Sequence, residues 1–179
     1  MPMPTRRGFL AGATLAPLAG PALASAEIEA RVDRALREMR ARVAGAAELE
    51  GQAKGLLMMP NIIKGGLIFG GAYGEGALRV GGVTEGYYSF AAATFGFQLG
   101  VQRIRYALFF MTDGALADFR RADGWTVGAD AEVTFPGDGV NLQLSSQTQR
   151  RPVIGVVFGQ DGLMAGASFQ GAKFSRIVR

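Results

Sequence analysis

The sequence predicts a mainly β domain of the α+β class, an antiparallel β sandwich or barrel-like fold with N-terminal amphipathic helices and one short inserted helix. Three observations lead to this fold class. Apolar residues recur at helical spacing over residues 27–43, near the start of the chain. From about residue 56 they alternate with polar residues, as in strands with one buried face. The 27 glycines and several turn motifs divide that second part into pieces typical of antiparallel β domains.

The first 26 residues are expected to be an export signal. Thr5-Arg6-Arg7-Gly8-Phe9-Leu10 is similar to a twin-arginine motif, and small residues near the end of the following apolar run suit cleavage after Ala24 or Ala26. A membrane anchor is the alternative, but the apolar run has 17 residues and two prolines, whereas a spanning helix needs about 20 apolar residues. We therefore predict a periplasmic protein, exported by the twin-arginine route. With no cysteine in the chain, it would not be a lipoprotein.

Residues 27–179 are predicted to form a single domain, with a helical lead-in over 27–55 and a mainly β part over 56–179. The whole chain carries 19 basic and 15 acidic residues, a net charge of +4. Removal of Arg6 and Arg7 with the signal leaves 17 against 15, or +2. So small an excess does not favour nucleic acid as a partner.

Three helices are expected. The apolar residues that recur at steps of three and four are Ile28, Val32, Ala35, Leu36, Met39 and Val43. They predict an amphipathic helix over residues 27–43, and a shorter helix follows at 46–53. Thr112 can cap a third helix over 113–121. Its inward-facing residues would be Leu116 and Phe119.

Alternation and turn residues predict the strands. The candidates are residues 67–69, 76–80, 95–101, 104–110, 125–135, 140–144, 153–158 and 163–169. Apolar residues move from odd to even positions near Gln102 and Arg103, which predicts a β-bulge or bend there. The run 108–111 is apolar at every position, as in a central strand covered on both faces. Pro136-Gly137-Asp138-Gly139 and Gln160-Asp161-Gly162 are expected to turn the chain.

The residue types exclude most common catalytic sites. With no histidine and no cysteine, the chain cannot form a Ser-His-Asp or Cys-His nucleophile or a His- or Cys-based zinc site. The glycines do not form a nucleotide-binding loop, since Gly74-x-Gly76 lacks the third glycine of that motif. We therefore expect neither a cofactor nor a metal. Asp130 and Glu132 share one face of a predicted strand and leave open a carboxylate-dependent hydrolase, although such residues are usually only solvated.

Basic residues are the candidates for binding an anionic surface. They are Arg31, Arg34, Arg37, Lys54, Lys64, Arg120 and Arg121. One basic side chain near such a surface contributes about 1 kcal/mol, so four supply about 4 kcal/mol, which corresponds to roughly millimolar affinity. Useful binding would also need apolar insertion. It is expected from the first helix or from Met58, Met59 and Phe69 if they are exposed.

Residues 53–76 resemble the opening of the SYLF domain, a lipid-binding family that is also labelled an actin-binding domain in its yeast members. The matching positions are Lys54, Pro60, Lys64, Tyr73, Gly74, Glu75 and Gly76. Segments at 96–102, 128–131 and 162–171 keep the resemblance in order. The resemblance implies binding of anionic lipids, phosphoinositides in eukaryotic relatives, through the N-terminal segment and basic residues. The segments 88–92 and 135–139 depart from the family pattern, so neither the particular lipid nor actin binding transfers.

Together these features predict a non-enzymatic periplasmic domain that associates peripherally with anionic phospholipid. Two alternatives remain open at this point. One is a structural or protein-interaction module that binds an envelope protein through the same surface. The other is the carboxylate-dependent hydrolase, which requires two acids in one pocket.

Overall fold

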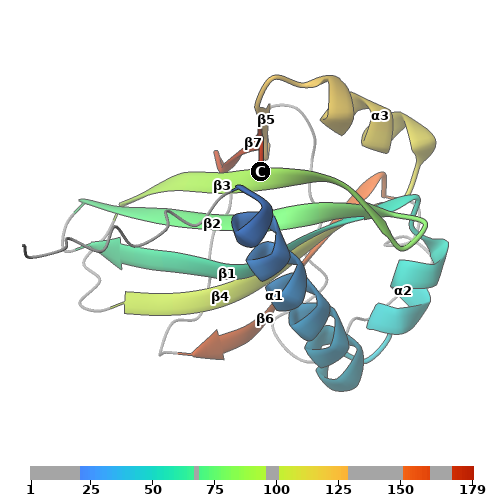
Figure 1. Ribbon diagram of the computed structural model, residues 1–179, viewed down its shortest axis with the longest axis horizontal. Helices are drawn as coiled ribbons and strands as arrows, with labels where there is room; N and C mark the ends of the chain where they lie inside the picture. The colour runs from blue at the N-terminus through green and yellow to red at the C-terminus, as the bar shows by residue number, and fades with distance from the viewer. Residues whose placement is uncertain (1–20, 67–68, 96–100, 129–150, 162–170) are drawn as a thin grey trace, which may run out of the picture.

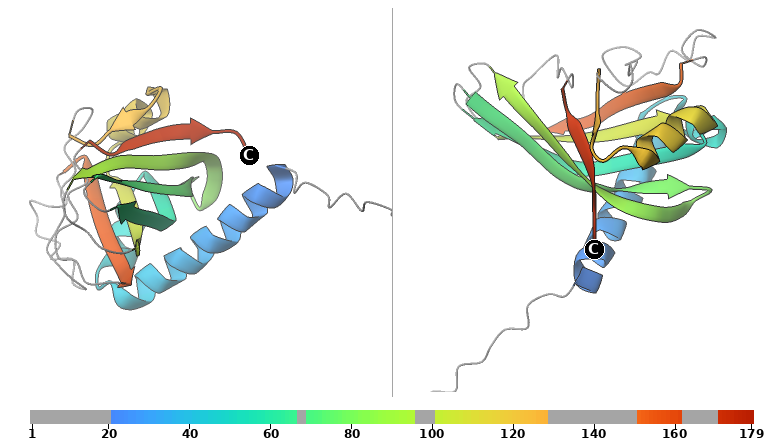
Figure 2. Two further views of the ribbon diagram at one scale, coloured as in Figure 1. Left: turned by 90° about the vertical axis from the view of Figure 1, so that its left-hand side faces the viewer. Right: turned by 90° about the horizontal axis from the view of Figure 1, so that it is seen from above.

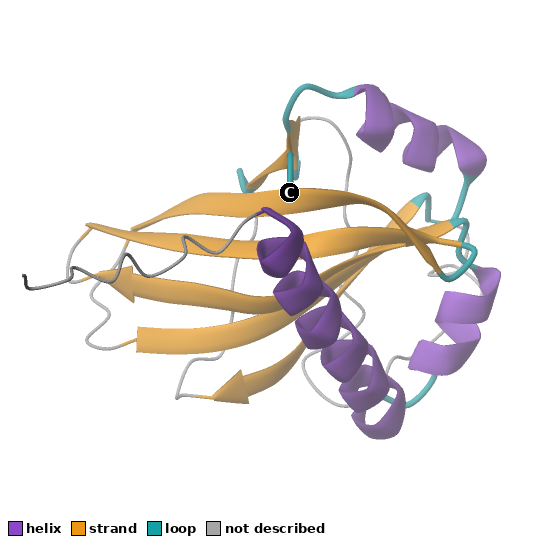
Figure 3. Cartoon of the chain, in the orientation of Figure 1, coloured by secondary structure: helices purple, strands orange, loops and turns teal. Residues whose placement is uncertain are grey.

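The computed structural model describes residues 21–66, 69–95, 101–128, 151–161 and 171–179. The helices are α1 (Pro21–Arg42), α2 (Ala46–Gln52) and α3 (Asp113–Arg121). The strands are β1 (Gly55–Gly66), β2 (Phe69–Val80), β3 (Val83–Phe95), β4 (Val101–Phe110), β5 (Trp125–Thr126), β6 (Val153–Asp161) and β7 (Lys173–Ile177). The strands form one curled antiparallel sheet in the order β5-β7-β3-β2-β1-β4-β6, with α1 lying diagonally across it (Figures 1 and 3). The predicted class, a mainly β antiparallel domain with N-terminal helices, is confirmed.

The sheet carries a different apolar layer on each face. We call the face beneath α1 and α2 the α1 face. Its buried sheet residues are Leu56, Met58, Ala77, Ala107, Phe109, Ile154, Val156 and Phe158. The opposite, aromatic face is covered by α3 and by the curl of the sheet (Figure 2). Its largest buried residues are Tyr88, Phe90, Tyr106, Phe110, Phe119, Trp125 and Phe174. Because β4 contributes to both layers, the prediction of a central strand covered on both sides at 108–111 is confirmed.

The apolar stripe of α1 is part of the α1-face core. All six apolar residues predicted to form it are buried against the sheet. The helix starts at Pro21, six residues earlier than predicted, because alanines favour helix and proline is tolerated in the first turn. The predicted cleavage positions after Ala24 and Ala26 thus fall in its first turns. Within the ranges that the structure describes, no helix has the length and hydropathy needed to cross a membrane.

The two shorter helices follow the sequence closely. The second was expected at 46–53 and ends one residue earlier. The third has the predicted bounds, and Thr112 Oγ1 accepts a hydrogen bond from the Ala115 amide at 3.2 Å, as its capping role requires. Leu116 and Phe119 are buried as predicted.

A β-bulge lies in the middle of β1. Met58 lies opposite Ala77 of β2, but Ile62 lies opposite Gly74, so β1 has one more residue than β2 in this interval. The same extra residue appears against β4, between Met59 and Ile62. Pro60 therefore lies at the bulge, where a missing amide hydrogen does not break the ladder. A slip was predicted at Gln102–Arg103, but β4 itself has no extra residue there. The extra residues lie in its neighbours, in β6 opposite Arg103–Arg105 and in β1 opposite Ile104–Tyr106.

Several strand predictions need correction. Residues 67–69 and 76–80 were expected as short separate strands, but β2 is continuous over 12 residues because its glycines fit against the bulge of β1. Met58 and Met59 are fully buried, so the expectation that they are exposed for insertion is wrong. The strands β1, β3 and β7 were not among the predicted strands. Other predictions fall outside what the structure describes: those for the side chain of Phe69, for 96–100, for 129–150 with Asp130 and Glu132, and for 162–170.

The tyrosines give a testable pH dependence. Burial raises the pKa of Tyr87, Tyr88 and Tyr106, and a hydrogen bond to Glu75 raises the pKa of Tyr73. In the unfolded chain these phenols ionise near pH 10. Below about pH 10 their raised pKa values therefore cost the fold nothing, and above it the free energy of unfolding falls as the pH rises. We expect tyrosinate absorbance to reach its full value only as β-sheet circular dichroism is lost. Complete ionisation near pH 10 with an unchanged circular dichroism spectrum would contradict this.

Candidate functional site

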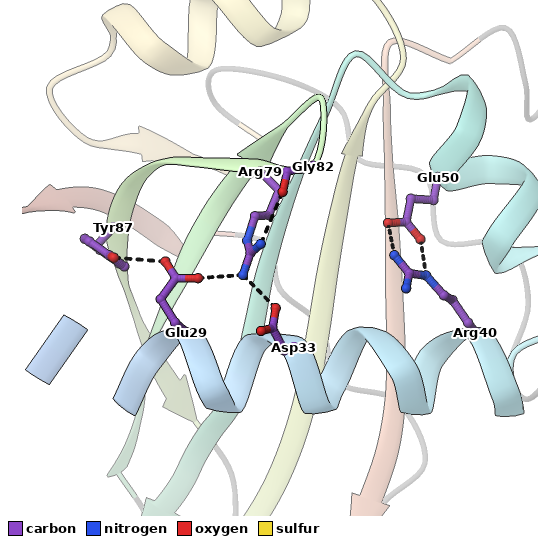
Figure 4. Close-up of polar contacts among 7 residues, drawn as sticks. All are labelled: Glu29, Asp33, Arg40, Glu50, Arg79, Gly82 and Tyr87. Carbon is purple, nitrogen blue, oxygen red and sulfur yellow. Dashed lines mark hydrogen bonds and ion pairs between the residues drawn. The ribbon is translucent and has the colours of Figure 1, made fainter. Parts of the chain in front are cut away.

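Ion pairs fix the position of α1 on the sheet (Figure 4). Arg79 of β2 donates from Nη2 to Glu29 at 2.5 Å and to Asp33 at 2.7 Å. The Tyr87 hydroxyl donates to the second oxygen of Glu29 at 2.9 Å. The acidic side of α1 is therefore paired with one arginine of the sheet and held against it.

A second clamp joins α1 to α2. Arg40 makes a bidentate pair with Glu50, with Nε and Nη2 at 2.7 and 2.6 Å from the two carboxylate oxygens (Figure 4). The hydrogen bond to Glu50 raises the pKa of Arg40, which stays charged in any case. Two-point pairing of this kind orients both side chains, so it holds the C-terminal half of α1 against α2.

On the other side of α1, arginines gather at a pocket of about 240 Å³. We call it the arginine pocket. Its charged lining residues are Arg31 and Arg34 of α1 and Arg103 and Arg105 of β4. The rest of its wall is formed by Ala35, Pro60, Asn61, Ile104 and Gly159. Among the described side chains, no carboxylate pairs with Arg31, Arg34 or Arg103. The pocket therefore concentrates positive charge at the bulge of β1.

Arg105 differs from the other three arginines because it is held in place. Its Nη1 donates to Glu38 Oε1 of α1 and to the Gly159 carbonyl oxygen of β6, each at 3.2 Å. Gly159 has φ +58°, and a Cβ there would lie 2.1 Å from Arg105 Nη1. Only glycine therefore allows both this backbone turn and the approach of the guanidinium.

An apolar strip lies beside the arginine pocket on the same face of the sheet, beyond the part that α1 covers. We define the apolar strip as Ile63, Gly65, Gly71, Tyr73, Ala91 and Ala93, all of which line one shallow depression. Ile63 and Tyr73 are 45% and 54% exposed, among the most exposed large apolar side chains described. Register makes the strip continuous with the pocket, because Arg103 lies opposite Ile63, and Ile63 opposite Tyr73.

A larger cleft of about 700 Å³ lies between α1, α2 and the start of β1. It holds Arg37 and Lys54, for which no ion pair is present within the described ranges. Its other cations, Arg40 and Arg79, are neutralised by the carboxylates described above. This cleft is therefore mixed in charge, unlike the arginine pocket.

The remaining predicted residues point elsewhere. Lys64 lies opposite Ala72, which belongs to the aromatic-face core, so the bulge places it on the face away from α1. Arg120 pairs with Glu85, and Arg121 with Asp118, both at α3. The seven basic candidates are thus divided among four places, and their role in binding stays a prediction.

Comparison with known protein families finds a match in the second half of the chain. Residues 91–177 match the family described as Ysc84, Las17-binding protein actin regulator. These residues, just under half of the chain, are similar to the SYLF family. The predicted resemblance is confirmed, and the SYLF family is one of binding domains. No curated protein matches the chain.

The Tyr-Gly-Glu-Gly motif at residues 73–76 has a structural role that the fold explains. The Tyr73 hydroxyl donates to Glu75 at 2.8 Å, and Glu75 also pairs with Arg179 near the C-terminus. Gly74 and Gly76 lie against the bulge of β1, where a Cβ would meet the Asn61 and Met58 carbonyl oxygens. The motif therefore supports the sheet next to Pro60.

The acidic residue of the Tyr-Gly-Glu-Gly motif is held in structural contacts. Glu75 is already paired with Arg179 and Tyr73. Within the ranges described, no three acidic residues gather as a metal ion would require. The arrangement of charge instead favours binding of an anion.

Four features of this surface were not predicted: the roles of Arg103, Arg105 and Ile63, and the exposure of Tyr73. The alternation of Arg103 and Arg105 with buried Ile104 and Tyr106 was a usable signal, since it places both arginines on one face of a strand. Nothing in the sequence brought them to Arg31 and Arg34, which lie about 70 residues earlier.

Proposed function

We propose that this domain associates peripherally with a membrane surface rich in anionic phospholipid. The binding surface would consist of the arginine pocket and the apolar strip. The observation that carries the proposal is their continuity: Arg103 and Ile63 are cross-strand neighbours on the α1 face. Similarity to a family of binding domains supports the proposal.

The energetics of such a surface favour weak and reversible attachment. Arg31, Arg34 and Arg103 near an anionic surface contribute about 3 kcal/mol together. Removing the exposed halves of Ile63 and Tyr73 from water adds about 1–2 kcal/mol each. The total of about 5–7 kcal/mol corresponds to a dissociation constant of roughly 10⁻⁴ to 10⁻⁵ M. Because α1 buries its apolar stripe in the core, insertion would come from the strip.

The proposed function also includes the mode of action and the location of the domain. The domain acts by binding and has no reaction centre, which fits the engagement of Glu75 in structural contacts. It works in the periplasm after export by the twin-arginine signal predicted from residues 5–26. Fractionation of cells that express the chain would test the location, and retention of an uncleaved chain in the cytoplasm would contradict it.

Vesicle flotation of the full chain tests the lipid proposal. We expect more protein to float with vesicles of phosphatidylglycerol and phosphatidylcholine than with phosphatidylcholine alone. Raising the salt from 0.05 to about 0.5 M should remove most of that difference, because exposed charges are then screened. The double variant Ile63→Ser/Tyr73→Ser should bind the anionic vesicles at least about tenfold more weakly, from the loss of roughly 2 kcal/mol of apolar burial.

Val83→Ser is the matched control. Val83 is 70% exposed at the start of β3, outside the pocket and the strip. It should leave vesicle affinity within about twofold of the original chain, since solvent-exposed substitutions away from a binding surface have small effects. Equal recovery with neutral and anionic vesicles at low salt would contradict the proposal. It would instead favour the alternative in which the surface binds an envelope protein.

A further inference from the structure

We propose that the arginine pocket is a specific site for a phosphate group, either the headgroup phosphate of a phospholipid or the phosphate of a small soluble ester. For a lipid phosphate the inference rests on the function proposed above. It goes further by naming a defined, saturable site, whereas general attraction to a charged surface needs none.

Positive charge from α1 and from β4 converges at the arginine pocket. Arg31 and Arg34 lie three residues apart in α1 and so project from neighbouring positions on one side of the helix. Arg103 and Arg105 lie two apart in β4 and project from one face of the strand. Four guanidinium groups thus line one pocket. Among the side chains that the structure describes, which do not include that of Asp161 opposite Arg103 in β6, Glu38 is the one carboxylate that contacts any of them, and it binds Arg105.

The four arginines differ in how firmly they are held. Arg105 is held by Glu38 and the Gly159 carbonyl, so its position does not depend on a ligand. Arg31, Arg34 and Arg103 are exposed and have no ion pair among the described side chains. A guanidinium group can donate two parallel hydrogen bonds to phosphate oxygens. One fixed and three adjustable guanidinium groups can therefore enclose a phosphate from several sides.

Three features of the chain together create the volume of the arginine pocket. Ala35 is small where α1 faces the sheet, and the bulge at Pro60 displaces the β1 backbone. Gly159 removes a side chain from the β6 side. The resulting volume of about 240 Å³ equals roughly eight water molecules at about 30 Å³ each. A phosphate with a short ester substituent fits such a space, and the Asn61 amide in the wall can donate to it.

The apolar strip lies where the acyl chains of a lipid bound at the pocket would extend. Arg103 at the pocket rim lies opposite Ile63, the first residue of the apolar strip. A headgroup phosphate bound by the arginines would place the adjoining glycerol and acyl chains over Ile63 and Tyr73. The same geometry accepts a soluble ester, whose organic part would then face solvent.

Titration calorimetry of the full chain with inorganic phosphate and with sn-glycerol 3-phosphate tests the site, at ionic strength held constant with chloride. We expect saturable binding of one phosphate per chain. The triple variant Arg31→Gln/Arg34→Gln/Arg103→Gln should weaken it by at least about tenfold, since each lost charge is worth up to about 1 kcal/mol. The matched control is Arg120→Gln/Arg121→Gln/Arg176→Gln, which removes the same charge from α3 and β7. It should stay within about twofold.

Conservative replacement separates geometry from charge. Arg31→Lys/Arg34→Lys/Arg103→Lys keeps every charge but cannot form bidentate contacts. We expect it to fold normally and to bind phosphate several-fold more weakly than the original chain, with more affinity than the glutamine variant. Equal phosphate affinity in the original, lysine and glutamine chains would overturn the site.

The source of the phosphate is resolved by competition. If sn-glycerol 3-phosphate displaces the chain from phosphatidylglycerol vesicles, the site takes a lipid headgroup. If it binds at the pocket without displacing vesicles, the site takes a soluble ester. The absence of saturable phosphate binding, or equal loss in the two glutamine triple variants, overturns the inference. Flotation that still depends on anionic lipid would then leave the membrane proposal intact without a specific pocket.

Discussion

Gly76→Ala is expected to lower the free energy of unfolding by about 3–5 kcal/mol, enough to unfold much of the protein near its working temperature. A Cβ at this position would lie 2.0 Å from the Met58 carbonyl oxygen and 2.7 Å from Met59 Sδ. The first contact is with backbone, so no rotation of a side chain relieves it. The β1 ladder itself would have to move.

The cause of this crowding is the bulge in β1. The extra residue between Met58 and Ile62 brings the β1 backbone toward β2 where Gly74 and Gly76 face it. Gly74→Ala should be destabilising as well, since its Cβ would lie 2.6 Å from the Asn61 carbonyl oxygen. The glycines of the Tyr-Gly-Glu-Gly motif therefore allow two backbones to approach closely.

Urea unfolding followed by fluorescence of Trp125, the single tryptophan, measures the effect. Gly71→Ala is the matched control in the same strand, where the nearest atom to a new Cβ is the Ala92 carbonyl oxygen at 3.9 Å. It should be neutral or stabilise by up to about 1 kcal/mol, because alanine restricts the unfolded chain more than glycine does. If the two alanine variants are equally stable, the bulge does not impose the requirement for glycine at position 76.

The bulge also explains how far the sequence could predict the site. Helical spacing and a capping threonine were enough for α1 and α3, because those signals are local. The continuously apolar run 108–111 was enough for the central strand. Pro60 in the middle of β1 was the available sign of a bulge, but the only shift visible in the alternation lay 40 residues later, near Arg103.

One extra residue reverses which face every later side chain occupies. In an unbroken strand, Ile63 would share the face of Leu57 and Met59, inside the aromatic core. With the bulge, Ile63 is exposed on the α1 face, and Lys64 takes the opposite face. Lys64 was expected to bind an anionic surface together with the α1 arginines, whereas the fold places Ile63 beside them. The arginine pocket depends on this reversal and on the tertiary packing of α1 on β4.

Val32→Asp tests whether α1 is a fixed part of the domain or a detachable membrane helix. Val32 is fully buried between α1 and the sheet. A carboxylate there has no partner, and burial without one costs more than about 4 kcal/mol even if the group becomes protonated. We expect the urea midpoint to fall sharply or the chain to be unfolded without denaturant.

Trp125 makes this result decisive because it lies on the opposite face of the sheet, in the aromatic core. If α1 and the sheet form one cooperative unit, a charge at Val32 destabilises the layer that Trp125 reports. Ala30→Asp, at an exposed position of the same helix, should change stability by no more than about 0.5 kcal/mol. A Val32→Asp chain with unchanged Trp125 unfolding and lost vesicle binding would show that α1 detaches to insert. Unfolding seen by Trp125 would instead require that the domain reach the membrane with α1 docked, by the arginine pocket and the apolar strip.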